Sequence, residues 1–361
     1  MTSVVLAGGG TAGHTSPLIA TARALESAGV RDLVAVGTAR GLEVRVIPEA
    51  GLDLELITPV PLPRGLSTQL LPLPWRLAKA VRESRAILRR HHADVVVGFG
   101  GYVSIPVYLA ARTMRVPVVV HEANNIPGIA NKIGARGAAF VATTFDTPMP
   151  GHPRRIGMPM DRRITHPELT AAQARERFGL DPERATLLVS GGSQGALAIN
   201  RALAQARDRV LAAGIQVLHV LGPKNWADDE IVTHASGARY VPVAFVADMA
   251  QAYTAADLMV GRAGAGTVME TAVSGLPVVF VPLPWGNGEQ GRNAAALVEA
   301  GGGRLLQEAD LTADTLAETV LELFGSEGRL DRMSEVARSM YAADAAEVLA
   351  REVLKVVDRK G

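Results

Sequence analysis

Two similar stretches of sequence decide the fold. The first, near the start of the chain, reads Val4-Val5-Leu6-Ala7-Gly8-Gly9-Gly10-Thr11-Ala12-Gly13-His14, and the second, near the middle, reads Leu187-Leu188-Val189-Ser190-Gly191-Gly192-Ser193-Gln194-Gly195-Ala196. In each, an apolar run typical of a buried strand passes into glycines. A strand that ends in glycines and leads into a helix brings backbone N–H groups and a helix N-terminus to one point, which favours a phosphate. The pair predicts an α/β fold of two doubly wound parallel-sheet domains facing a cleft, where a donor and an acceptor that both carry phosphate could meet.

The bulk composition is that of a globular protein with more than one domain. The chain has 361 residues, of which 48% are apolar and 20% charged, and this length fits two domains of about 150–180 residues each. The 37 Lys and Arg residues balance the 36 Asp and Glu residues, whereas a nucleic-acid-binding protein needs a basic excess. Because the chain has no cysteine, disulfides, thiolate metal sites and a cysteine nucleophile are excluded. We therefore expect no nucleic-acid partner.

The sequence carries no signal for export or for crossing a membrane. The first strand begins at Val4 with no charged and apolar leader ahead of it, so no signal peptide is expected. A membrane-spanning helix needs about 20 apolar residues, and the longest apolar run, Leu276 to Trp285, contains three prolines. Any contact with a membrane is therefore expected to be peripheral.

Short apolar runs alternate with helix-forming stretches, which is typical of βαβ units around parallel sheets. We expect strands at 4–7, 33–36, 94–98, 116–120, 138–142, 186–190, 215–220, 238–241, 257–260 and 277–281, and helices at 17–28, 75–91, 104–112, 197–212 and 266–274. Prolines and glycines between residues 147 and 170 indicate a linker. The predicted domains are 1–157 and 158–340. The tail is expected to be helical over 327–358, and its last part, within the segment 341–361, is expected to pack back on the first domain.

The first glycine loop is compatible with more than one kind of site. Gly8-x-Gly10-x-x-Gly13 matches the dinucleotide fingerprint, but the second strand ends in Gly37-Thr38 instead of the acid that binds a ribose. The loop also mimics a nucleoside-triphosphate loop, except that His14 stands where lysine is required. A tight structural turn is the third possibility. Because a neutral histidine beside a phosphate loop is suited to general-base catalysis, we favour that role for His14 over a structural one.

Polar residues follow other predicted strands at the same edge of each sheet. In the first half these are the segments 98–104 and 121–125. In the second half, the stretch 261–270 can offer the N–H groups of a helix start to a diphosphate, and Glu270 can accept two hydrogen bonds from a ribose diol. The amides of Gln290 and Asn293 can donate to and accept from sugar hydroxyls. Ordinary loop polarity and, for Glu270, a favourable interaction with the helix dipole are the alternatives.

An apolar segment rimmed by cations stands out between residues 62 and 77. We expect it to form a membrane patch that rests on an anionic lipid surface, and its members are Leu66, Leu70, Leu71, Trp75, Arg76 and Lys79. The alternative is a loop followed by an amphipathic core helix with solvated arginines.

Taken in order along the chain, these motifs resemble the MurG family, the peripheral membrane glycosyltransferases of bacterial peptidoglycan synthesis. The strongest parts of the resemblance are 9–14, 98–104, 121–124, 191–196, 262–270 and 289–293. The resemblance implies two Rossmann-like domains in the GT-B glycosyltransferase architecture. It also implies transfer of GlcNAc from UDP-GlcNAc to a lipid-linked muramyl-pentapeptide diphosphate (lipid I), which gives lipid II, on the cytoplasmic side of the cell membrane.

The resemblance further implies which residues bind the substrates. The donor-binding set is Thr11, Ala12, Gly13, Asn124, Ser193, Val246, Gly264, Ala265, Gly266, Thr267, Val268, Met269, Glu270, Gln290 and Asn293. The acceptor-binding set is Gly10, Gly101, Tyr102 and Asn131, and Thr11, Gly13, His14 and Asn124 also lie on the acceptor side. Ser193 and the loop 264–268 would hold the diphosphate and Glu270 the ribose. Phe245, Val246 and Met249 would flank the uracil, and Gln290 and Asn293 would orient the sugar.

The sequence thus predicts an inverting, metal-independent glycosyltransferase without a cofactor. No Asp-x-Asp pair is present to hold a metal, so the loops would stabilise the departing diphosphate electrostatically, while His14 deprotonates the acceptor hydroxyl. A UDP-GlcNAc epimerase and a non-catalytic sugar-nucleotide-binding protein of the same fold stay open as alternatives. The family's arginine after the linker is replaced in register by Asp161, so either Arg162 or Arg163 could reach the donor.

Overall fold

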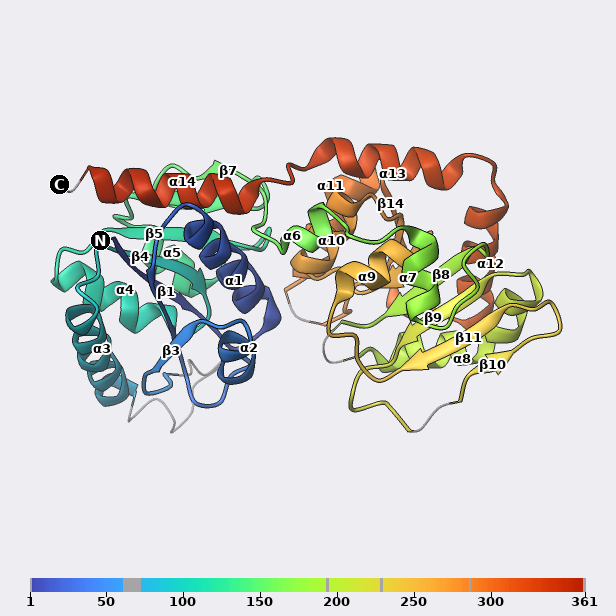
Figure 1. Cartoon of the computed structure of the whole chain (residues 1–361), viewed down its shortest axis with the longest axis horizontal. Coiled ribbons are helices and arrows are strands. Elements are labelled where there is room, and N and C mark those ends of the chain that lie inside the picture. The colour runs from blue at the N-terminus through green and yellow to red at the C-terminus, as the bar shows by residue number, and fades with distance from the viewer. Residues whose placement is uncertain (1, 61–72, 193–194, 228–229, 286, 360–361) are drawn as a thin grey trace. The chain divides into compact units, whose positions relative to one another are not determined.

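The computed structural model describes residues 2–60, 73–192, 195–227, 230–285 and 287–359. The chain divides into two compact units (Figure 1): unit 1 is Met1–Asp161 with Asp344–Gly361, and unit 2 is Arg162–Ala343. Each unit is built around its own parallel sheet.

Unit 1 is a sheet of seven strands in the order β3-β2-β1-β4-β5-β6-β7, and all of its neighbouring strands are parallel. The first six strands have the Rossmann order. The elements are β1 (Ser3–Gly8), α1 (Ala12–Ser27), β2 (Asp32–Gly37), α2 (Glu43–Glu49), β3 (Asp53–Leu56), α3 (Leu73–Arg90), β4 (Val95–Gly100), α4 (Ser104–Thr113), β5 (Val118–Glu122), α5 (Ile129–Ala135), β6 (Phe140–Thr143), β7 (Arg154–Arg155) and α14 (Ala345–Asp358).

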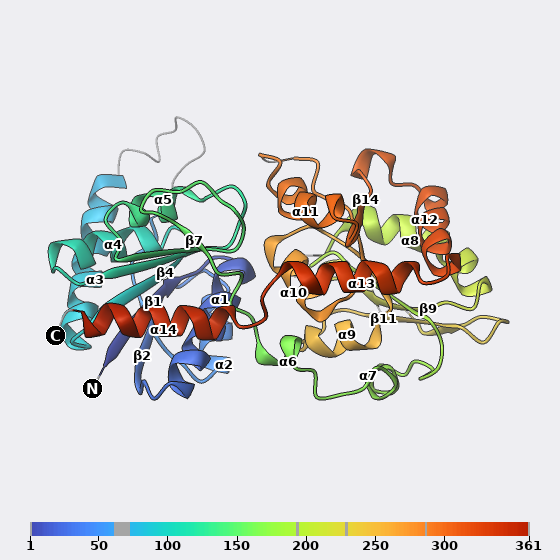
Figure 2. The ribbon, with the colours of Figure 1, turned by 90° about the horizontal axis from the view of Figure 1, so that it is seen from above.

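Helices cover both faces of the unit 1 sheet, which explains why its inner strands are apolar along their whole length. α1, α2 and α14 lie on one face, and α3, α4 and α5 lie on the other (Figure 2). The C-terminal helix α14 belongs to this unit because Leu349, Val353 and Val356 are buried in the same core cluster as β1 and α1.

Unit 2 repeats the same plan with a sheet in the order β10-β11-β9-β8-β12-β13-β14. Only β10, at the edge of the sheet as the structure describes it, is antiparallel to its neighbour. α8 and α12 pack on one face, and α9 lies over the other (Figures 1 and 2). The elements are α6 (Arg162–Thr165), α7 (Ala171–Arg177), β8 (Thr186–Ser190), α8 (Leu197–Ala212), β9 (Gln216–Val220), β10 (Val232–Thr233), β11 (Arg239–Val243), α9 (Met249–Ala255), β12 (Leu258–Gly261), α10 (Ala265–Ser274), β13 (Val278–Phe280), α11 (Glu289–Glu299), β14 (Gly303–Leu305), α12 (Ala313–Gly325) and α13 (Arg329–Met340).

Two predicted helices differ from the observed ones. The first helix begins at Ala12 and not at residue 17, because the carbonyl of Thr11 already accepts from the N–H groups of His14 and Thr15. The helix therefore starts inside the glycine loop and carries His14 in its first turn. The tail 327–358 is two helices, α13 in unit 2 and α14 in unit 1, separated at residues 341–344.

Each sheet has a switch point where its connections pass from one face to the other. It lies between β1 and β4 in unit 1 and between β8 and β12 in unit 2. In open α/β sheets, ligands bind outside the carboxyl ends of the strands at this point. Among the described residues, no helix has the length and apolarity that crossing a membrane would require.

Candidate functional site

The switch point of unit 1 is lined by glycine. Gly8 pairs with Gly100 where β1 and β4 end. Gly101 has a φ of +80°, and a Cβ added to it would lie 2.6 Å from the carbonyl oxygen of Gly9. Only glycine tolerates both that conformation and that approach. The two strand exits therefore fit directly against each other.

His14 projects from the first turn of α1 at this point. Its Nδ1 lies 2.9 Å from the carbonyl oxygen of Gly9 and 3.3 Å from the hydroxyl of Thr11. Since a carbonyl can only accept, Nδ1 carries the proton and Nε2 has the free lone pair. Burial lowers the pKa of His14 below its ordinary value, and the Gly9 carbonyl and the carboxylates of Glu122 and Glu43 partly oppose this. The ring is therefore neutral at physiological pH and presents Nε2 as a base.

The other predicted residues of unit 1 differ in accessibility. Gly10, Thr11, Gly13 and Tyr102 are exposed, whereas Ala12, Gly101 and Asn124 are half-buried. They surround the exits of β1, β4 and β5, so the structure brings the sequence-predicted residues of this unit to one edge of its sheet.

Asn131, a predicted acceptor-binding residue, is buried within a hydrogen-bonded network. Its amide donates to Oε2 of Glu122 at 3.0 Å, and its Oδ1 accepts from the hydroxyl of Tyr108 at 2.9 Å. Glu122 also accepts from the backbone N–H groups of Asn124 and Gly128, each at 3.0 Å. The side chain of Asn131 therefore holds Glu122, and Glu122 holds the loop that carries Asn124. Glu122 belongs to the polar segment 121–125 that the sequence predicts at this edge, whereas no sequence pattern indicates Tyr108.

Glu43 is a carboxylate of this site that sequence reasoning missed. It lies in the first turn of α2 and is 1% exposed. Its Oε2 accepts from the backbone N–H of Gly10 at 2.8 Å. An acid therefore does lie next to the end of the second strand, as a dinucleotide site would need, but it binds the protein's own glycine loop.

The switch point of unit 2 places a carboxylate beside a helix start. Gly264 is the N-cap of α10, and Glu270 lies in the second turn of that helix. Oε2 of Glu270 accepts from the hydroxyl of Tyr253 at 2.8 Å, which orients the carboxylate. The first N–H groups of a helix have no partner within it, so this end can bind an anion. Ala265, Val268 and Met269 are buried, whereas Gly264, Gly266 and Thr267 are half-buried.

The two predicted sugar-orienting amides are already tied to neighbouring backbone. Oε1 of Gln290 accepts from the N–H of Leu283 at 3.1 Å, which turns its NH₂ group the other way. Asn293 is buried, and its amide lies 3.4 Å from the carbonyl of Ala263. Gln290 therefore contacts the backbone that follows β13, and Asn293 contacts the backbone that follows β12.

The predicted uracil-binding segment lies at the start of α9. Phe245 is exposed, Val246 is buried and Met249 is half-buried. Arg163 donates to Asp248 at 2.9 Å, which brings this arginine to the same segment. Of the two arginines left open by the sequence, Arg163 is thus the one beside it.

Several predicted residues fall outside the part of the chain that the structure describes. They are Ser193, Leu66, Leu70 and Leu71. The described members of the predicted membrane patch, Trp75, Arg76 and Lys79, are exposed near the start of α3. Within the described ranges, no group of His, Cys, Asp and Glu side chains is arranged to hold a metal ion.

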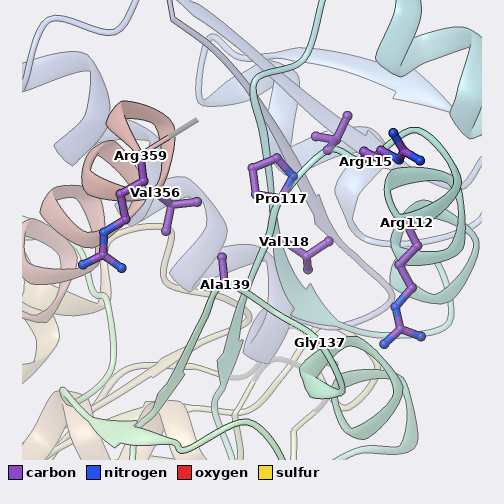
Figure 3. A pocket seen from close by; sticks show the side chains of 9 residues that line it. Arg112, Arg115, Pro117, Val118, Gly137, Ala139, Val356 and Arg359 are labelled. Atoms are coloured by element: carbon purple, nitrogen blue, oxygen red, sulfur yellow. The ribbon is translucent and has the colours of Figure 1, made fainter. Parts of the chain in front are cut away.

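A cavity of about 470 Å³ lies in unit 1, away from these residues. Its floor is formed by Pro117, Val118, Ala139 and Val356, at the edge where β5 and β6 begin. Figure 3 shows arginines around it whose guanidinium groups point away from one another. The cavity therefore has an apolar floor without a converged set of polar groups, and the predicted site stays at the carboxyl edge of the sheet.

The sequence matches two family models that together cover most of the chain. They are the glycosyltransferase family 28 N-terminal domain, over residues 4–143, and the glycosyltransferase family 28 C-terminal domain, over residues 186–349. The crystal structure of CalG4, the calicheamicin glycosyltransferase, shares the fold with a TM-score of 0.69 at 17% identity and is covered over its full length. The fold and the family models define a two-domain glycosyltransferase of the GT-B class.

Relatives of higher sequence identity show which family of this class the chain belongs to. A UDP-N-acetylglucosamine–N-acetylmuramyl-(pentapeptide) pyrophosphoryl-undecaprenol N-acetylglucosamine transferase of Cutibacterium acnes is 54% identical over 98% of this chain and 97% of its own. The enzyme of the same name from Nocardioides sp. is 50% identical over 98% of each chain. The crystal structure of Acinetobacter baumannii MurG matches with a TM-score of 0.78 at 28% identity, over 98% of this chain and 100% of that one. The chain belongs to the MurG family.

Two fully enclosed histidines give the fold a pH dependence. Nε2 of His121 donates to the carbonyl of Gly157 at 3.0 Å, and His219 lies between the hydroxyl of Tyr240 at 2.9 Å and Oδ1 of Asn200 at 3.1 Å. Burial lowers the pKa of each ring from 6.5 to about 4. Both rings are therefore neutral in the folded protein under conditions in which the unfolded chain binds protons.

We predict that the folded state loses stability as the pH falls from about 6.5 towards 4. In that range the unfolded chain takes up a proton at each histidine and the folded chain does not. Each histidine therefore lowers the free energy of unfolding by up to about 3 kcal/mol. Urea unfolding at pH 7 and pH 5 measures the loss, and His219→Gln should make it smaller. The exposed His166→Gln is the control. An unchanged loss in His219→Gln would contradict the assignment.

Proposed function

We propose that this chain transfers GlcNAc from UDP-GlcNAc to N-acetylmuramyl-(pentapeptide) pyrophosphoryl-undecaprenol, lipid I, and so makes lipid II. The observation that carries the proposal is the name shared by relatives about 50% identical along nearly the whole chain. A base at the switch point of unit 1 and a carboxylate beside a helix start in unit 2 support it. We assign the acceptor to unit 1 and the donor nucleotide to unit 2.

The chemical step is a single displacement with His14 as the base. Nδ1 of His14 donates to the Gly9 carbonyl, so Nε2 takes the proton of the acceptor hydroxyl. The hydroxyl oxygen then forms its bond to the anomeric carbon as the bond from that carbon to UDP breaks on the opposite face. UDP leaves with the electron pair, and the α-linked donor gives a β-linked product. A positioned base of this kind contributes about 10²–10⁴-fold to rate.

The start of α10 is the proposed place of the donor diphosphate. Within the described part of the chain, no atom lies within 4 Å of a Cβ added to Gly264, so a ligand can approach the backbone closely. The free N–H groups and the dipole of α10 favour the charge that develops on the leaving group. We assign the ribose hydroxyls to Glu270, whose carboxylate is oriented by the hydroxyl of Tyr253. Arg163, beside Asp248, is the arginine we assign to the donor.

The first test is turnover of UDP-GlcNAc with and without a lipid-linked acceptor. We predict that UDP is released with formation of the β-linked disaccharide only when the acceptor is present, and that the rate survives EDTA. Epimerisation of UDP-GlcNAc without acceptor would favour the epimerase. Binding without any turnover would favour the non-catalytic protein, and rescue of an EDTA-treated enzyme by Mg²⁺ would contradict the metal-free step.

Glu270→Ala should weaken UDP binding by about 10- to 100-fold, because it removes charge-assisted hydrogen bonds worth about 1.5–3 kcal/mol. Calorimetry with UDP measures this directly. Glu318→Ala, which removes an exposed carboxylate of the same unit, is the matched control and should bind like the unmodified protein. Unchanged affinity in a folded Glu270→Ala protein would remove the ribose assignment.

We also propose that unit 1 holds the protein on the cytoplasmic face of the membrane. Trp75 is 81% exposed at the start of α3, and Arg76 and Lys79 are exposed beside it. A solvated tryptophan flanked by cations suits the surface of an anionic bilayer, where each cation contributes about 1 kcal/mol. Leu66, Leu70 and Leu71 complete the patch as the sequence predicts it.

Replacing Trp75 by Ser together with Arg76→Gln and Lys79→Gln should lower binding to anionic liposomes at least about tenfold. Use of a long-chain acceptor should fall with it, while turnover of a short-chain soluble acceptor stays nearly unchanged. Trp285→Ser, which removes an exposed tryptophan of unit 2, is the control. If the triple variant co-sediments with liposomes as the unmodified protein does, the patch is not the anchor.

A further inference from the structure

Glu43 is a buried carboxylate with all of its partners inside the first glycine loop and the exit of β2. Oε2 accepts from the N–H of Gly10 at 2.8 Å, and Oε1 accepts from the N–H and the hydroxyl of Thr38, each at 3.0 Å. The carboxylate thus accepts three hydrogen bonds, one from the exit of β1 and two from the exit of β2. It therefore links the two strand exits and is not a solvated side chain. A hydrogen bond to a charged group is about twice as strong as one between neutral groups.

The backbone around Glu43 is shaped to admit this side chain. A Cβ added to Gly9 would lie 2.6 Å from Oε1, and one added to Gly37 would lie 2.5 Å from Cγ. A Cβ on Gly41 would overlap the carboxylate itself. Glycines in the first glycine loop, at the end of β2 and just before α2 therefore leave the space that Glu43 fills.

The carboxylate is one peptide unit away from the proposed base. Glu43 binds the N–H of Gly10, and the carbonyl of the same peptide bond, that of Gly9, accepts from Nδ1 of His14 at 2.9 Å. Because a peptide unit is planar, fixing its N–H also fixes the direction of its carbonyl. A hydrogen bond at one end of a peptide also polarises the other end, which strengthens the bond to His14.

We infer that Glu43 is a positioning residue for catalysis: through the Gly9–Gly10 peptide it holds His14 in the tautomer and orientation that present Nε2 to the acceptor. This inference rests on the proposed function and assigns a role to a residue with no substrate contact of its own. The charged groups that act on His14 are Glu43, from α2, and Glu122, from the end of β5.

Glu43→Gln is the variant that tests it, because glutamine keeps the length and shape of the side chain. Its oxygen can still accept from Thr38, but its NH₂ group then faces the N–H of Gly10, and two donors cannot pair. We expect kcat with a soluble acceptor to fall about 10- to 100-fold, while the KM for UDP-GlcNAc changes less than about twofold.

The pH profile separates positioning from a structural role. Glu43 raises the pKa of His14, so loss of its charge should move the acid limb of kcat/KM to lower pH. Asp257→Asn is the matched control: this carboxylate of unit 2 accepts from Arg175 at 2.8 Å and from the N–H of Thr186 at 2.7 Å. The Asp257→Asn protein should have the same kcat and pH profile as the unmodified protein.

Gly41→Ala provides a second variant if Glu43→Gln does not fold. It displaces the carboxylate by contact and keeps every other group, and it should also lower kcat. The inference is overturned if a folded variant, of either kind, keeps the unmodified kcat and acid limb. Failure of the unmodified protein to turn over UDP-GlcNAc with acceptor would instead overturn the proposed function.

Discussion

The close approach of β1 and β4 at their carboxyl ends is the constraint on which unit 1 depends. Gly8 pairs with Gly100, and Gly101 lies against the Gly9 carbonyl where a Cβ would come within 2.6 Å. A side chain at this contact would push the two strand exits apart. Because the exits touch, α1 can begin inside the loop, and its first turn carries His14 to the switch point. The arrangement of the sheet, the start of the helix and the direction of the histidine ring thus follow from one contact between backbones.

Unit 2 uses the same topology for a different electrostatic purpose. At the β1 exit of unit 1, the N–H of Gly10 donates to Glu43, so the protein's own carboxylate occupies part of the anion-binding capacity of the loop. At the β12 exit of unit 2, Gly264 caps α10, and within the described part of the chain no atom lies close to the face where its Cβ would point. In unit 1 a carboxylate of the protein accepts from the glycine loop at the switch point, where His14 is the proposed base. In unit 2 the N-terminus of α10 stays accessible to a charged ligand. A donor that leaves as a diphosphate and an acceptor that must lose a proton need these two different environments.

The sequence predicts the inner strands well and the sheet edges poorly. All ten expected strands are present with ends within two residues, because strands covered on both faces are continuously apolar. The strands that were not expected, β3, β7, β10 and β14, are the four edge strands, which are short and partly exposed. The site shows the same division. Glycine loops and polar strand ends are local in sequence and can be recognised, but Glu43 lies 33 residues from Gly10 and Tyr108 lies 23 residues from Asn131. Contacts over such separations depend on how the helices pack on the sheet, and no short motif records them.

The partner of His14 decides what kind of base it can be. A carboxylate bonded directly to Nδ1 would favour the protonated ring strongly and raise its pKa. A backbone carbonyl instead fixes the same tautomer with only a partial charge, so burial prevails and the pKa of His14 falls below its ordinary value. Glu43 and Glu122 act from further away and limit that fall of the pKa. In the mechanism we propose, the ring is neutral before the reaction, and the two carboxylates would stabilise the positive charge that it acquires as a base. Glu43 is joined to the histidine only through the Gly9–Gly10 peptide, and Glu122 acts on it only through its charge, so neither carboxylate bonds directly to the ring and both requirements are satisfied.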